Sequence, residues 1–341
     1  MTESIDSNGI STPARISIWF SIGLSLVVVG IIAALTTKPD TLSHLRNTHW
    51  GLLALAPVFV AIRILLGAWR LQYVARGCLR FAGAMRAQLA WDFFSNVTPS
   101  TLGGGPIVPA YIFRDSRIPL GEATAFMLFA MLLDQIWIAF GIAGILIGSL
   151  AIDLIPDSLG TVGSVTFILY LSGYLAWVVL FAYATLFRPQ FLAGLVRKVF
   201  SLRVLRRLHD RASSVMNTLQ QRAHVLRTQR PLFYVKGFLL TVAVWFSRYI
   251  LVVIILASFY DGLDYILALM RTIAIMLGAL IMPTPGGAGG VEGLYALMVG
   301  PLVPQGLIAP SLLIWRILAY YVFLAAGAYL TLHQVMKRKP T

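Results

Sequence analysis

Long apolar stretches separated by short polar connections dominate this chain. Six of them are long enough to cross the hydrocarbon core of a bilayer as an α-helix, which needs about 20 residues. Soluble domains do not carry repeated apolar runs of this length, so the pattern predicts transmembrane helices. The six predicted spans cover residues 16–35, 51–73, 123–150, 162–186, 233–259 and 311–332.

Proline and glycine interrupt two further apolar stretches. The first, 81–113, is broken at 98–106, and the second, 265–309, is broken at 283–292. Proline removes a backbone donor and glycine does not favour the helical conformation, so neither stretch continues as one helix. At membrane depth the freed backbone groups must be satisfied by protein or by water in a cavity. The pattern therefore predicts two re-entrant hairpins, each made of two short helices joined by a break.

Charged residues beside the broken stretches predict opposite orientations for the two hairpins. Arg86 and Arg114 flank the first one, which places its ends in the cytoplasm by the positive-inside rule. Asp261 and Asp264 precede the second one in a connection without basic residues, so its ends are expected outside. Corresponding spans and breaks follow one another at a similar offset in the two halves. This arrangement is typical of an inverted-topology repeat.

The predicted fold is therefore an all-α integral membrane protein with six full transmembrane helices and two re-entrant broken-helix hairpins in an inverted-topology repeat. The first repeat covers residues 16–150 and the second covers residues 162–332. Both tails, 1–15 and 333–341, are expected in the cytoplasm, because the second one carries Lys-Arg-Lys and the number of crossings is even. The expected location is a bacterial cytoplasmic (inner) membrane.

Composition supports a membrane protein and changes the meaning of the charge. Of 341 residues, 58% are hydrophobic and only 12% are charged, although the net charge is +14. The basic residues cluster beside apolar spans, so they indicate contact with anionic lipid and not with nucleic acid. Residues 188–230 combine many of them with apolar residues at helical spacing, which predicts an amphipathic helix on the anionic cytoplasmic leaflet. The alternative is a solvated linker helix.

Several kinds of chemistry are not indicated by the sequence. Cys78 is the only cysteine, and the five histidines lie in connections or at span ends, so no metal site or other cofactor is expected. Neither glycine-rich break is followed by the Lys-Ser/Thr pair of a nucleotide-binding loop. No nucleophile elbow or catalytic pair of acids is present either. The sequence thus predicts a protein that is not an enzyme.

Charged residues inside the predicted spans and hairpins mark the candidate site. Each costs about 2.5–3.5 kcal/mol at the bilayer centre, so it is expected to face a protein interior or a wet hollow. Arg70 is expected to snorkel toward the membrane surface. Asp134 and Arg316 occupy comparable places in the two repeats, so an ion pair between them is expected, with either a coupling or a locking role. The interior set is Arg63, Asp134, Arg248, Arg271, Glu292 and Arg316.

This set contains more arginines than carboxylates, which suits a ligand that carries phosphate, because guanidinium binds phosphate through two parallel hydrogen bonds. The helices expected to begin near Pro106 and after Gly290 would add free N–H groups and a positive dipole end. Glu292 lies in the first turn of the second of these helices. It is expected either to cap that helix or to take part in ligand binding or proton coupling, for which Asp134 is the other candidate.

Motifs at the breaks and in the last span resemble those of a known family. They are Asn96-Val97-Thr98-Pro99 followed by Gly103-Gly104, Pro-Thr-Pro-Gly-Gly ending at Gly287 and followed by Glu292, and Trp315-Arg316 with Tyr320-Tyr321. In this order they resemble the lysylphosphatidylglycerol synthase transmembrane family, the flippase-like domain also found at the N-terminus of the multiple peptide resistance factor. The substrate-binding residues expected from the breaks, the interior arginines and this resemblance are Asn96, Thr98, Pro99, Gly103, Gly104, Arg248, Thr284, Pro285, Gly286, Gly287, Glu292 and Arg316.

The resemblance implies a lipid translocase that moves a phosphate-bearing amphiphile between leaflets. The cargo would be an aminoacylated phosphatidylglycerol or a polyprenyl-phosphate-linked sugar. Gly105 and Pro106 stand where many relatives carry Gln or Glu, which leaves the head group open. The soluble transferase domain is absent, so a cytoplasmic synthase or glycosyltransferase is the expected partner. The alternatives are a permease for a small anion, a scaffold that positions such a synthase, and a lipid-modifying enzyme using Asp134 or Glu292. The oligomeric state is left open.

Overall fold

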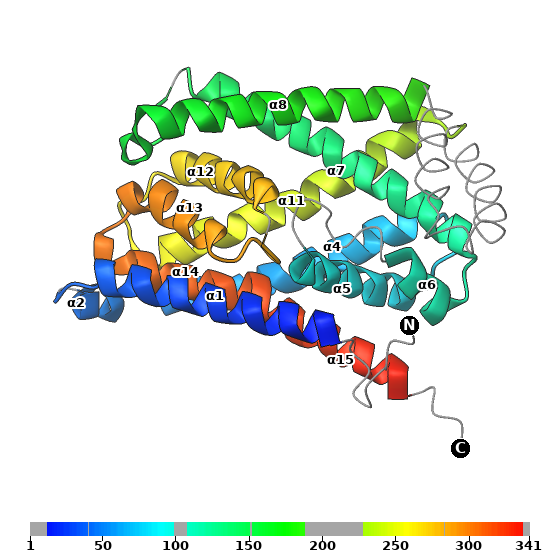
Figure 1. Cartoon of the computed structure of the whole chain (residues 1–341), viewed down its shortest axis with the longest axis horizontal. Helices are drawn as coiled ribbons and strands as arrows, with labels where there is room; N and C mark the ends of the chain where they lie inside the picture. The colour runs from blue at the N-terminus through cyan, green and yellow to red at the C-terminus, as the bar shows by residue number, and fades with distance from the viewer. Residues whose placement is uncertain are drawn as a thin grey trace.

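The computed structural model describes residues 12–39, 41–98, 108–150, 152–187, 228–282 and 284–336. The predicted site residues Pro99, Gly103 and Gly104 lie outside these residues, and so do almost all of the basic insert 188–230 and most of both tails. The described part is built from helices joined by turns and short connections (Figure 1).

Five described segments are long and apolar enough to cross a membrane. They correspond closely to five of the predicted spans, because a sustained apolar run fixes a buried or lipid-facing helix with little help from context. Four of them lie in α3 (Trp50–Leu53) with α4 (Leu55–Val74), in α7 (Leu120–Gly148), in α8 (Gly160–Phe187) and in α11 (Pro231–Phe259). The fifth lies mainly in α14 (Ile308–Arg316), η6 (Ile317–Tyr321) and α15 (Val322–Met336).

The sixth predicted span lies in α1 (Thr12–Thr36), a helix of 25 residues. It packs against α14 and α13, so it closes one side of the bundle. A turn of π-helix at η6 interrupts the last segment, directly after Arg316. Such bulges are frequent at functional sites because they re-aim the side chains beside them.

Two helical hairpins stand where the broken stretches were predicted. The first pairs α5 (Phe81–Val97) with α6 (Val108–Ser116). The second pairs α12 (Tyr265–Gly278), continued by η3 (Ala279–Ile281), with α13 (Gly290–Val299). Since α12 has 14 residues, it is about 21 Å long and too short to cross a hydrocarbon core of about 30 Å. Two helices therefore lie on either side of each predicted break, and the length of α12 is consistent with re-entry into a membrane.

Polar contacts tie together the open ends of both hairpins. In the first, the Arg86 guanidinium contacts the Asp115 carboxylate at 2.9 Å. In the second, Arg271 donates to the Met298 carbonyl at 3.1 Å and to the carbonyls of Asp153 and Leu154 at 3.0 and 3.2 Å. Arg271 thus needs no carboxylate partner inside the protein, because three backbone carbonyls satisfy it.

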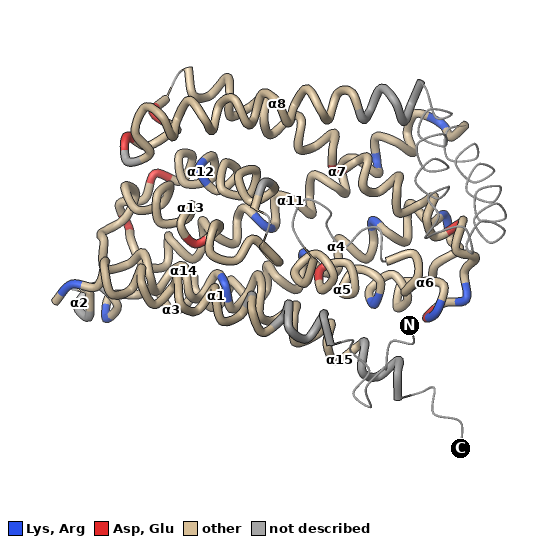
Figure 2. Tube along the Cα trace, in the orientation of Figure 1, with Lys and Arg blue, Asp and Glu red and all other residues tan. Residues whose placement is uncertain are grey.

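Helix α11 runs through the middle of the fold and packs against α4, α7, α12 and α14 (Figure 1). Helix α8 lies at one long edge of the molecule, packed on α7, and only 17% of the residues in its most apolar stretch are buried. Exposed apolar surface of this kind is what a lipid-facing helix requires. Charged residues gather at the two ends of the helices, and only a few lie within the bundle (Figure 2).

Gly327 is expected to be essential for the contact between α15 and α5. A Cβ atom at this position would lie 2.2 Å from the Cβ of Phe93, which is fixed to the backbone of α5. The substitution Gly327→Ala should therefore lower the free energy of unfolding by about 1–3 kcal/mol, as overpacking does in a close-packed core. Thermal unfolding of the detergent-solubilised protein measures this. Gly144→Ala is the matched control, because a Cβ there would meet nothing within 4 Å, and a loss of equal size would contradict the argument.

Candidate functional site

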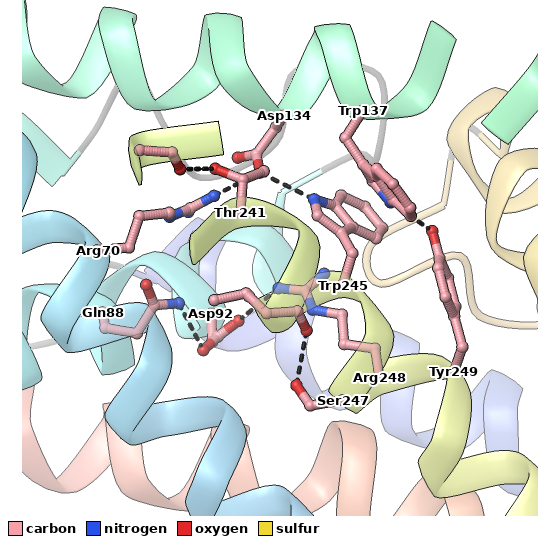
Figure 3. A network of polar contacts seen from close by, with 12 residues as sticks. Arg70, Gln88, Asp92, Asp134, Trp137, Thr241, Trp245, Ser247, Arg248 and Tyr249 are labelled. Atoms are coloured by element: carbon pink, nitrogen blue, oxygen red, sulfur yellow. Dashed lines mark hydrogen bonds and ion pairs between the residues drawn. The ribbon is translucent and has the colours of Figure 1, made fainter. Parts of the chain in front are cut away.

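The first cluster of buried charges is centred on Asp92, which lies on α5 and receives three donors. The guanidinium of Arg63, from α4, contacts its Oδ1 atom. The guanidinium of Arg248, from α11, contacts the same atom at 3.2 Å. The side-chain amide of Gln88, one turn earlier on α5, donates to Oδ2 at 3.0 Å (Figure 3). One carboxylate therefore holds two arginines from the two halves of the chain.

Tight packing holds Gln88 in place behind this carboxylate. A Cβ atom at Gly67 on α4 would lie only 2.6 Å from the Gln88 side-chain amide carbon, so a larger residue there would displace the Gln88 side chain. Sequence reasoning missed Asp92 and Gln88 as interior polar residues. Their spacing of four residues, which puts both on one helix face inside an apolar stretch, is the signal that points to them.

Asp134, on α7, is held by a different pair of donors. Arg70, from α4, contacts its Oδ1 atom, and the indole N–H of Trp245, from α11, donates to the same oxygen at 2.8 Å (Figure 3). Two expectations are wrong here. Arg70 does not snorkel, because it is only 2% exposed and its guanidinium is turned into the bundle. Asp134 does not pair with Arg316, because the nearest guanidinium is supplied by the neighbouring helix α4.

The second cluster surrounds the break between α12 and α13. Gly286, Gly287 and Gly289 have positive φ values of 60°, 66° and 85°, a conformation that side chains with a Cβ rarely adopt. The Gly287 amide donates to the Thr284 carbonyl at 3.0 Å, and the Thr284 hydroxyl donates to the Ala288 carbonyl at 2.8 Å. The chain thus makes a tight turn that satisfies part of its own backbone.

Glu292 is fully buried in the first turn of α13, which begins at Gly290, next to its predicted start. Its Oε2 atom accepts from the Gly289 amide at 2.8 Å, so the expected helix-capping role is confirmed. The same oxygen lies 2.7 Å from Nη2 of Arg316, an ion pair that is not an aligned hydrogen bond. The Ser25 hydroxyl, from α1, donates to Oε1. A role of Glu292 in ligand binding or proton coupling stays a prediction.

Arg316 connects this cluster to the break itself. Its Nη1 atom lies 3.4 Å from the Gly286 carbonyl, and its guanidinium carbon lies 5.2 Å from the centre of the Tyr320 ring. Its Nε atom is buried without a hydrogen-bond partner. The positive end of α13 therefore already faces a carboxylate, and Arg316 is the cation that balances that carboxylate.

The two clusters are joined along one face of α5. A Cβ atom on Gly286 would lie 3.2 Å from the Asn96 carbonyl, so the C-terminal end of α5 touches the second break. Asn96 and Asp92 are four residues apart and share a helix face. The structure thus brings together Asn96, Gly286, Glu292 and Arg316, and it places Arg248 one turn away beside Asp92. Thr98, Thr284, Pro285 and Gly287 lie in the turns that bound this region.

The described residues contain no group of three or more histidine, cysteine, aspartate or glutamate side chains placed to hold a metal ion. The interior charges pair mostly with one another, and the arrangement is suited to recognition of an anion by guanidinium groups. A groove of about 590 Å³ is lined by Leu146, Ser172, Leu175, Ala176, Val179 and Leu180, at the lipid-facing contact of α7 and α8. It is apolar and lies apart from the charges.

Comparisons with known proteins agree with the sequence motifs. The family model described as the lysylphosphatidylglycerol synthase TM region matches residues 18–327. A UPF0104 membrane protein of Archaeoglobus fulgidus is 22% identical to this chain over 327 residues, covering 93% of this chain and 96% of its own length. Both matches extend across the two hairpins and the buried charge clusters.

Proposed function

The chain belongs to the family of the lysylphosphatidylglycerol synthase transmembrane region, and we propose that it is a lipid translocase. Its cargo would be an amphiphile with a phosphate-bearing head group, such as an aminoacylated phosphatidylglycerol or a polyprenyl-phosphate-linked sugar. The observation that carries this proposal is the set of interior arginines along α5 and at the second break, with Arg63 and Arg248 on Asp92 and Arg316 beside Gly286. Charged side chains at membrane depth are costly, so interior arginines in a multi-pass membrane protein point to a functional site.

In this proposal the two parts of the amphiphile take different paths. The head group would pass the polar face of α5, where Arg248 and Arg316 lie, while the acyl chains stay in the bilayer against the apolar outer surface. The two hairpins enter from opposite sides, and rocking of one repeat against the other would change the leaflet from which the site is reached. The cytoplasmic membrane of a bacterium, with both tails in the cytoplasm, is the proposed location.

A translocation assay tests the proposal. The purified protein is reconstituted into phosphatidylcholine vesicles with a trace of head-group-labelled phosphatidylglycerol, and dithionite bleaches the label in the outer leaflet. Wild type should expose inner-leaflet label that stays protected in protein-free vesicles. The double variant Glu292→Gln/Arg316→Gln removes the charge pair without leaving one charge alone, and it should exchange lipid about tenfold more slowly or worse.

Arg86→Gln is the matched control for this assay. It also removes an arginine from an ion pair, but at the open end of the first hairpin, where its side chain is 41% exposed. It should translocate lipid at the wild-type rate. Wild-type vesicles that behave like protein-free vesicles would reject the lipid proposal. Uptake of radiolabelled inorganic phosphate in the same vesicles would then favour a permease for a small anion.

A further inference from the structure

Arg63 and Arg248 occupy equivalent places in the two halves and converge on one carboxylate oxygen. Arg63 lies in α4, the helix before the first hairpin, and Arg248 lies in α11, the helix before the second. Both contact Oδ1 of Asp92. This group of two guanidiniums and one carboxylate carries one positive charge in excess. Within the described residues, the other interior arginines are matched, Arg70 by Asp134, Arg316 by Glu292 and Arg271 by three carbonyls.

The excess charge is best assigned to Arg248. Its contact with Asp92 is 3.2 Å long, and its side chain is 28% exposed, against 8% for Arg63 and 5% for Asp92. The Arg63–Asp92 pair is therefore the fixed, enclosed part of the group. The Nε atom of Arg248 is buried and has no hydrogen-bond partner, although Nε and a neighbouring Nη form the edge that binds phosphate through two parallel bonds. Arg248 thus holds an unused donor and an unbalanced charge.

We propose that Arg248 is the binding site for a phosphate monoanion, which competes with Asp92 for its guanidinium (Figure 3). The Arg63–Asp92 pair stays in place. Because Arg63 shares the charge of Asp92, it weakens the attraction of Asp92 for Arg248. The chemistry is shared by inorganic phosphate and by the phosphodiester of a phospholipid head group. Only the choice of the lipid as the natural source rests on the proposed translocase function. The ring of Trp245, 4.8 Å from the guanidinium carbon, keeps the cation oriented on its remaining side.

Competition gives Asp92 an effect opposite to that of an ordinary structural residue. Asp92→Asn keeps the shape of the side chain but removes the charge that competes for Arg248. We expect it to bind phosphate about tenfold more tightly than wild type, since close charge pairs couple with more than one kcal/mol. Arg248→Gln should lose binding. Arg63→Gln removes the excess charge and leaves Arg248 balanced by Asp92, so its binding should weaken.

Isothermal titration calorimetry of the full chain in a non-ionic detergent measures these changes. The probes are inorganic phosphate, dihexanoyl-phosphatidylglycerol, and dihexanoyl-phosphatidylcholine, whose zwitterionic head group should bind more weakly. Arg86→Gln is the control and should bind like wild type. Weaker binding by Asp92→Asn, or unchanged binding by Arg248→Gln, would overturn the proposal. If Asp92→Asn does not fold, Arg63→Gln decides, with unchanged binding counting against the site.

The outcomes separate this site from the proposed function. If phosphate binding in detergent follows the expected order of variants but the vesicles show no lipid exchange, the anion site stands and the translocase is rejected. Lipid exchange at the wild-type rate in Arg248→Gln would do the reverse. Tighter binding of the phosphatidylglycerol probe than of inorganic phosphate identifies a lipid as the preferred source. Equal or weaker binding identifies free phosphate.

Discussion

Glu292→Ala is expected to destabilise the folded protein by about 3–5 kcal/mol, because it leaves the guanidinium of Arg316 buried without a counter-ion. The carboxylate it removes is fully buried and lies 2.7 Å from Nη2 of Arg316. The same substitution removes the cap of α13 and leaves the Gly289 amide without its acceptor. Unfolding in a detergent and denaturant mixture, followed by circular dichroism, measures the loss.

A double-mutant cycle identifies how much of this loss comes from the unpaired charge. Glu292→Gln/Arg316→Gln removes both charges, so it should be clearly more stable than the sum of its single variants, Glu292→Gln and Arg316→Gln, would predict. Asp261→Asn serves as a surface control, because its carboxylate is 86% exposed and its contact with His49 should contribute at most about 1 kcal/mol. A Glu292→Ala protein as stable as this control would show that Arg316 is satisfied by other groups.

The helices were predictable because the signals for them are local. A predominantly apolar run predicted a span at 51–73, and the structure has one at Trp50–Val74. Proline and glycine predicted the second break, and α13 begins at Gly290, next to the start expected after that residue. Each of these decisions depends on residues close in sequence, so no knowledge of the three-dimensional arrangement was needed.

The partners of the interior charges were not predictable in the same way. Asp134 and Arg316 stand in comparable spans of the two repeats, but equivalence in an inverted repeat does not imply contact. Each side chain instead meets a charge on a helix packed beside its own, Arg70 for Asp134 and Glu292 for Arg316. Arg70 looked like a residue near a span end, and only the packing of α4 against α7 and α11 turns it inward.

Asp92 escaped the sequence analysis for a related reason. Like Arg271, it lies in an arm of a predicted hairpin, but it stands beside aromatic residues and outside every motif at the breaks. Its importance comes from three contacts with Arg63, Gln88 and Arg248, two of which are long-range. When the arginines in the apolar segments of a protein outnumber the carboxylates, a single acidic residue in one of those segments is therefore a candidate partner for them.

Asp134→Ala should be nearly as damaging as the loss of Glu292, with an expected destabilisation of about 3–5 kcal/mol. Its carboxylate is the only described counter-ion of the Arg70 guanidinium, whose side chain is 3% exposed, and it also accepts from the Trp245 indole at 2.8 Å. The substitution would leave a buried cation and a buried N–H group unpaired on two helices that cross α7. Trp245 fluorescence reports the change at the site, and denaturant unfolding measures its size.

The pair Arg70→Leu and Arg70→Leu/Asp134→Leu completes the test. Arg70→Leu alone leaves a buried carboxylate that still accepts from Trp245, so it should cost less than Asp134→Ala. The double variant replaces both charges with apolar groups and should recover much of the lost stability, as apolar replacements of buried ion pairs often do. Arg86→Gln, whose pair with Asp115 is partly exposed, should cost at most about 1 kcal/mol. A double variant no more stable than Asp134→Ala would contradict this argument. It would mean that polar side chains at this site, and not the balance of their charges, maintain the packing of α4, α7 and α11.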